Sequence, residues 1–228
     1  MNLRHYCGMT VLGMLFGGCS ILPKAEAPEI YLLPTTAAEV MPRQAAPAKS
    51  LRIVTPQAAR ALDNNRIAVL PRDHVITSYQ GARWSDRAPR LLRDRLLDAF
   101  RTDGRFAAVS SDEAQLQADL ELTGDLRAFQ AEYVHGAPVV VIRYDAQLVA
   151  GSSRKILATR RFDVRQPVAG KEVPQVVTAF GQATDRLAAQ VITWVATSAN
   201  EAGRAGTRRK DLPGPAFQRF PEDRLSRP

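Results

Sequence analysis

Apolar and polar residues alternate with a period of two through most of residues 118–165, which is the pattern of half-solvated β-strands. The apolar positions fall into three groups: Ala118, Leu120, Leu122, Gly124 and Leu126; Val140, Ile142, Tyr144, Ala146 and Leu148; and Ile156, Ala158, Phe162 and Val164. Glycine-containing segments at 136–138 and 151–153 fall where turns are needed. The pattern predicts a three-stranded antiparallel meander with one face on a core.

Two other segments repeat apolar residues every three or four positions and predict amphipathic helices. The first covers residues 86–103, with Ser85 as the expected N-cap and Gly104 as the residue that ends the helix. The second begins near Pro174 and carries an apolar stripe from Val176 to Val195. We expect this stripe to pack in the core, and the alternative is that it lines a lipid-binding groove.

Short apolar runs at 30–34, 51–54, 66–71 and 106–109 predict further strands, and residues 79–84 are interpreted as a loop. Together these elements predict an α+β fold. Its sheet is mixed or mainly antiparallel and contains the three-stranded meander. Two amphipathic helices are expected to pack on one face of this sheet.

The N-terminus has the layout of a bacterial lipoprotein signal. Arg4 precedes an uncharged segment, 7–18, which is shorter than the roughly 20 apolar residues of a membrane-spanning helix. The segment ends in Leu15-Phe16-Gly17-Gly18-Cys19, a lipobox. We expect Cys19 to be acylated and to become the mature N-terminus; an ordinary secretory signal or a buried apolar strand are the alternatives. The residue after Cys19 is Ser20 and not Asp, and Gram-negative lipoproteins without Asp at this position usually go to the outer membrane.

Composition divides the chain into four parts. Residues 1–18 are the expected signal peptide, and residues 19–49 are a Pro- and Ala-rich tether with a short strand that docks on the core. Residues 50–198 form the folded α+β domain, and residues 199–228 are interpreted as a disordered basic tail. The tether is expected to let the domain stand away from the bilayer.

Charge and cysteine content exclude several function classes. The formal net charge is +8, but charges alternate in sign within the domain, so we expect no nucleic-acid partner. Loss of Cys7 with the signal and acylation of Cys19 leave no free thiol for a disulfide, a zinc site or a nucleophile. No cofactor or metal site is expected.

An enzyme is not expected either. The sequence has no GxSxG motif, and His74 and His135 occur in unlike contexts, although a hydrolase that pairs one of them with a serine and a carboxylate is a third hypothesis. Tyr79 and Trp84 leave two interpretations open: they cap the core, or they form an exposed anchor for a partner.

The order of these features resembles a known family. The lipobox is followed by Tyr31-Leu32-Leu33-Pro34, Arg66-Ile67-Ala68-Val69-Leu70, the segment 79–84 leading into Pro89-Arg90-Leu91-Leu92, the meander and the closing helix. Over residues 15–197 the chain is similar to the ABC-type transport auxiliary lipoproteins, the family that contains paraquat-inducible protein C.

The resemblance implies a periplasm-facing outer-membrane lipoprotein that works with an inner-membrane ABC permease, its ATPase and an MCE-domain protein carrying lipid or other hydrophobic cargo. It would be an accessory and not a motor, in agreement with the lack of a GxxxxGK[ST] phosphate loop. A homo-oligomer is possible on this view. The alternative function is a structural or assembly lipoprotein of an envelope or secretion complex.

Overall fold

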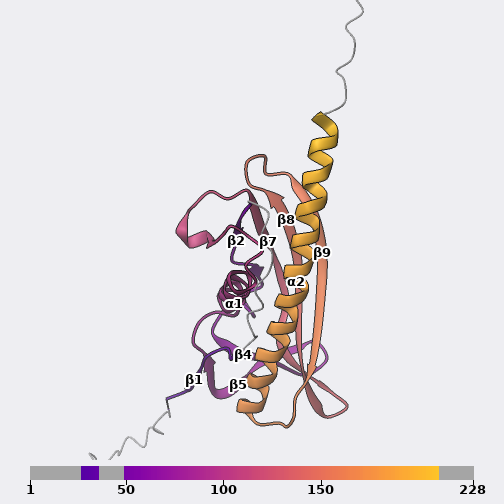
Figure 1. Ribbon diagram of the computed structural model, residues 1–228. Coiled ribbons are helices and arrows are strands. Elements are labelled where there is room, and N and C mark those ends of the chain that lie inside the picture. The colour runs from indigo at the N-terminus through magenta and orange to yellow at the C-terminus, as the bar shows by residue number, and fades with distance from the viewer. Residues whose placement is uncertain (1–26, 36–48, 211–228) are drawn as a thin grey trace, which may run out of the picture.

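The computed structural model describes residues 27–35 and 49–210 of the 228-residue chain, so Cys19 and the expected signal peptide lie outside the described residues. The fold is α+β, with one curled mixed sheet and two helices (Figure 1). The elements are β1 (Glu29–Tyr31), β2 (Ser50–Ile53), β3 (Gln57–Ala58), β4 (Arg66–Arg72), β5 (Val75–Trp84), α1 (Ala88–Asp103), β6 (Ala108–Ser111), the 3-10 turn η1 (Asp112–Ala114), β7 (Leu120–Val134), β8 (Ala137–Ala150), β9 (Ile156–Pro167) and α2 (Val173–Lys210).

Strand β7 is the centre of the sheet. Along one edge it pairs with β8 in antiparallel orientation over almost its whole length. Along the other edge it pairs in parallel with β2, β3 and β4 in turn, at Leu51↔Leu120, Gln57↔Asp125 and Ala68↔Gln130. The sheet is completed by β6 beside β2, by β5 beside β4 and by β1 beside β5.

The predicted meander is confirmed as β7, β8 and β9, with turns at both predicted places. His135 and Gly136 both have positive φ, 50° and 79°, as two-residue hairpin turns require. Strand β7 is longer than the predicted segment and continues to Val134. A register shift between Leu126 and Ala128 places two residues against one at that point, and this bulge hides the continuing alternation from the sequence pattern.

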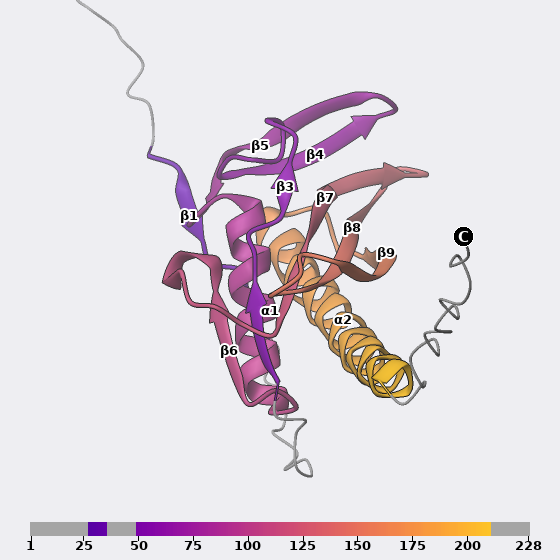
Figure 2. The same ribbon diagram turned by 90° about the horizontal axis from the view of Figure 1, so that it is seen from above.

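Both predicted helices are present and pack on each other and on the sheet, which curls around them (Figure 2). Gly104 ends α1 with φ of 70° and donates its N–H to the carbonyl of Phe100 at 3.2 Å, as expected. The predicted N-cap is wrong, because Arg87 occupies that position without a side-chain capping bond.

The stripe of α2 faces the core, so packing is confirmed for its members: Val176, Val177, Phe180, Thr184, Leu187, Ala188, Val191, Ile192 and Val195 are all buried. The helix is longer than predicted and reaches Lys210, so the first part of the expected disordered tail is helical. Gly203 and Gly206 do not end the helix, because each glycine costs only about 1 kcal/mol in a helix and no proline occurs between Pro174 and Pro213. Residues 211–228 lie outside the described residues.

The predicted docking strand is confirmed as β1, which pairs in parallel with the end of β5. The Ser85 N–H donates to the Tyr31 carbonyl at 2.9 Å. After β1, Pro34 crosses α2 at Gly181, where an added Cβ would come within 2.7 Å of the Pro34 carbonyl oxygen. The N-terminal segment is therefore held by both the sheet and a helix.

The predicted loop at residues 79–84 is wrong, because these residues belong to β5. Two register shifts in the β4–β5 pair and a positive φ of 67° at Gly81 interrupt the alternation. Gln80 and Gly81 are consecutive exposed residues between the half-buried Tyr79 and the buried Ala82. An irregular strand of this kind has the polar composition of a loop.

Candidate functional site

Trp84 is a core residue. Its side chain is 1% exposed and packs edge-on against Phe180 and Phe129, with ring centroids 5.2 Å and 6.1 Å away. Its backbone N–H donates to the Asn65 carbonyl at 2.7 Å, which fixes the end of β5. A partner anchor at this position requires exposure, which Trp84 does not have.

Tyr79 is half-buried and packs against the edge of the core. Its hydroxyl is buried and has no hydrogen-bond partner among the described residues. Burial, followed by the nearby Tyr133 hydroxyl, raises the pKa of the Tyr79 phenol above its ordinary value. The Trp84 Nε1 is also buried without a partner, so both aromatic residues act in this structure through packing.

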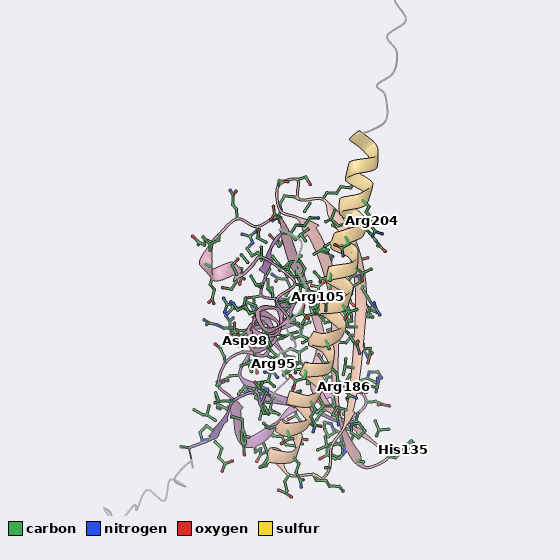
Figure 3. All side chains as sticks on the ribbon, in the orientation of Figure 1. Arg95, Asp98, Arg105, His135, Arg186 and Arg204 are labelled. Carbon is green, nitrogen blue, oxygen red and sulfur yellow. The ribbon has the colours of Figure 1, made fainter. Side chains whose placement is uncertain are left out.

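The two histidines are not brought into a catalytic arrangement in the described part of the chain. His74 lies at the β4–β5 turn and His135 at the β7–β8 turn, both exposed and both with positive φ (Figure 3 labels His135). Within residues 27–35 and 49–210, neither imidazole hydrogen-bonds to a serine or a carboxylate, and no cluster of metal-ligating side chains is found. The same residues contain no helix long and apolar enough to cross a membrane.

The buried Arg93 is the centre of an ionic cluster, with partly exposed acidic partners, that the sequence pattern did not reveal. Its guanidinium donates to Asp94 at 2.6 Å, to Asp112 at 3.1 Å and to the Thr55 hydroxyl at 3.2 Å, and lies 3.0 Å from Glu113. Burial opposes its charged form, but the hydrogen bonds to Glu113, Asp94 and Asp112 outweigh burial and raise its pKa. The cluster joins α1 to η1 and to the segment after β2.

Asp112 makes the stability of this cluster depend on pH. Burial alone would raise the pKa of its carboxyl, but hydrogen bonds from Thr55 and Arg93 outweigh burial and lower it below the ordinary 3.8. A pKa that is lower in the folded state stabilises the fold above the unfolded value, and that contribution is lost as the pH falls through the folded value.

We therefore expect the urea midpoint of the wild type to fall as the pH is lowered from about 6 to about 3, and the fall to be shallower for Asp112→Asn. Asp119 and Asp145 also have lowered pKa values, so part of the fall remains in the variant. Urea unfolding followed by far-UV circular dichroism across this range measures both slopes. Superimposable slopes for wild type and variant would contradict the assignment.

The solvent face of the meander carries paired charges. Asp145 accepts two hydrogen bonds from Arg161, at 2.5 Å and 2.7 Å, and one from Arg127 at 3.2 Å, and Arg143 pairs with Asp163 at 2.8 Å. The Arg161 guanidinium, with Arg127, holds the pKa of Asp145 below its usual range. A shallow depression of about 340 Å³ at this face is lined by the same ion pair, whose charges are already neutralised.

Exposed large apolar side chains gather at one end of the molecule. Ile30 and Leu32, on and beside β1, are 71% and 74% exposed, and Val75, Ile76 and Val134 are exposed at the β4–β5 and β7–β8 hairpins. Figure 1 shows β1 and both hairpins in the lower part of the molecule, opposite the C-terminal end of α2. We call these five residues the apolar end.

Comparison with known proteins identifies a family match over the folded domain. The model of the family described as "ABC-type transport auxiliary lipoprotein component" matches residues 31–192, which is more than half of the chain. The matched range begins at β1 and ends within α2.

Two solved structures share the fold. The chain is 27% identical to protein XCC0632 from Xanthomonas campestris, with a TM-score of 0.71, and the match covers 77% of this chain and 99% of that one. A second crystal structure, of an uncharacterized protein, is 15% identical with a TM-score of 0.60 over 75% of this chain and 99% of that chain. The second likeness shows the fold alone.

One curated relative is similar in sequence. The uncharacterized protein bll6063 of Bradyrhizobium diazoefficiens is 29% identical over 146 residues, which are 64% of this chain. The matched region spans only 39% of that longer relative.

Proposed function

Because the chain belongs to the ABC-type transport auxiliary lipoprotein component family, we propose that it is an outer-membrane lipoprotein of an ABC/MCE-type transport system, anchored through acylated Cys19 and facing the periplasm. Family membership makes it a membrane-anchored lipoprotein of the bacterial envelope and an auxiliary component of ABC-type transport. The family is not a catalytic one. The outer membrane, the lipid or other hydrophobic cargo and the MCE-domain partner belong to the proposal.

The observation that carries the proposal is the family match over residues 31–192, which covers all of α1, part of α2 and the whole of the sheet except the first residues of β1. The lipobox before this range supplies an attachment point, because its cysteine is the residue that lipoprotein processing modifies. Two or more acyl chains give stable membrane binding, since each buried methylene contributes about 0.8 kcal/mol.

The partners that we propose are the permease, the ATPase and the MCE-domain protein of one transport system. The buried position of Trp84 removes the earlier candidate for a docking residue, and Tyr79 is only partly accessible on β5. A cross-linking and co-purification experiment on the intact envelope identifies the partners directly. Recovery of secretion components in place of a permease and its ATPase would instead favour the assembly-lipoprotein alternative.

Replacement of the acylated cysteine tests the proposed location. We expect Cys19→Ser to lose nearly all association with the outer-membrane fraction and to fail to complement a strain that lacks the gene, because the variant has no thiol for the acyl group. Mass spectrometry of the wild type is expected to show a modified Cys19 at the N-terminus, and fractionation measures the loss. Cys7→Ser is the matched control and should leave both location and complementation unchanged. An unmodified Cys19 in exported wild type would refute the anchor.

A further inference from the structure

The exposed apolar side chains are unevenly distributed along the molecule. Among the described residues, seven large apolar side chains are exposed. Five of them belong to the apolar end, and only Leu116 and Ile156 lie elsewhere. β7 runs from the other end toward His135, and the Leu70↔Glu132 pair places the β4–β5 and β7–β8 tips beside each other. Figure 3 shows His135 low in the molecule and Arg204 high on α2. The two tips therefore present aliphatic residues at one end of the fold.

The chain enters the fold at the same end. Ala27 is the first described residue, and β1 runs parallel to β5, so Ala27 and Pro28 lie on the side of the β4–β5 hairpin. Ala27 follows Cys19 by eight residue steps, and a chain of that length spans at most about 28 Å. Docking of β1 thus makes the stretch between Cys19 and the fold much shorter than the 31-residue tether, 19–49, that composition predicts.

This reach is short in comparison with the domain. Helix α2 has 38 residues and is therefore about 57 Å long. If acyl chains on Cys19 lie in a bilayer, Ala27 cannot be more than about 28 Å from its surface. In the opposite orientation, the C-terminal end of α2 would face the membrane. The limit of about 28 Å on Ala27 would then force part of this helix into the bilayer, so the length of the chain after Cys19 excludes that orientation.

From these observations we infer that the apolar end rests on the phospholipid surface to which Cys19 is anchored, with the β4–β5 and β7–β8 tips inserted among the lipid headgroups and the C-terminal end of α2 directed away from the membrane. The inference depends on the proposed acylation of Cys19. Arg72 and Asp73 beside the β4–β5 tip are both exposed and of opposite charge, so aliphatic insertion and not net charge carries the contact. The contact between the apolar end and a phospholipid surface should therefore not weaken when salt is added.

Fluorescent labelling of single cysteines tests the orientation. The chain contains only Cys7 and Cys19, so a cysteine introduced into the acylated, processed protein is its one free thiol. The full chain is expressed as a lipoprotein with Ile76→Cys or Val134→Cys, and the matched control is Ser153→Cys in the β8–β9 turn at the opposite end. Each is labelled with an environment-sensitive dye and reconstituted into phosphatidylethanolamine–phosphatidylglycerol vesicles, with or without nitroxide-labelled lipid.

We expect nitroxide lipid to reduce the fluorescence at positions 76 and 134 by about twofold or more, with a blue shift, because insertion reaches roughly 5–10 Å into the headgroup region. The dye at position 153 should be unaffected. Near-UV circular dichroism verifies folding, and Val75→Cys replaces any hairpin variant that does not fold.

Flotation of the same vesicles separates the two ways of failing. If neither the wild type nor Cys19→Ser floats with the vesicles, the proposed anchor is wrong, and the proposed orientation is wrong with it. If the wild type floats but positions 76 and 134 are not quenched, or position 153 is quenched as strongly, the membrane contact alone is wrong and the proposed function stands.

Discussion

Gly124→Ala is expected to lower the free energy of unfolding by roughly 4 kcal/mol or more, which is enough to unfold a marginally stable domain. Gly124 lies in the first half of β7 with φ of 151°, a backbone conformation that L-residues rarely adopt. An added Cβ would lie 2.0 Å from the carbonyl oxygen of Asp145 on β8. Because that atom belongs to the backbone of the paired strand, relief of the clash requires separation of β7 from β8.

A second glycine provides the control for this experiment. Gly81 also has positive φ, 67°, but no atom lies within 4 Å of its added Cβ. Gly81→Ala therefore introduces backbone strain without a clash and should cost only about 1 kcal/mol. Urea unfolding of both variants measures the difference, and equal costs would show that the close approach of β7 and β8 is not what requires glycine at position 124.

Trp84→Ala is expected to destabilise the domain by about 3–5 kcal/mol, because it removes a large buried ring and leaves a cavity. The ring lies between the sheet and α2, where it contacts Phe129 and Phe180. Thermal unfolding monitored by circular dichroism measures the loss. Loss of partner binding in this variant would therefore report on folding and not on a docking surface.

Trp84→Phe is the matched variant. The Trp84 Nε1 has no hydrogen-bond partner in the described residues, so phenylalanine removes volume without breaking a hydrogen bond. We expect a clearly smaller loss than for alanine. A loss as large as that of Trp84→Ala would mean that the indole N–H makes an essential interaction.

The regular parts of the fold were predictable because their patterns are repetitive. Strict alternation of apolar and polar residues predicted the meander. Apolar residues spaced three or four positions apart predicted α1 and the buried stripe of α2. A glycine after the apolar repeat also located the end of α1 at Gly104. Each of these features depends on neighbours in the sequence.

The incorrect predictions lie where the pattern is irregular or the contact is distant. The bulge after Leu126 concealed half of β7, and the positive φ of Gly81 made β5 resemble a loop. Placement of Trp84 in the core depends on Phe180, almost a hundred residues away, which no local pattern reports. The Arg93 cluster was missed for the same reason, since its partners Thr55 and Asp112 come from separate parts of the chain.

The central position of β7 has a consequence for the order in which the protein can fold. Strands β2, β3 and β4 all pair in parallel with β7, so this part of the sheet is completed only when residues 120–132 are available. Pairing between distant segments slows folding, because loop-closure entropy is lost before the new contacts compensate for it. The N-terminal half cannot complete its sheet until most of the chain has been synthesised. Late completion of the sheet would leave the chain unfolded for longer after synthesis, as the export required by the proposed anchoring of Cys19 demands.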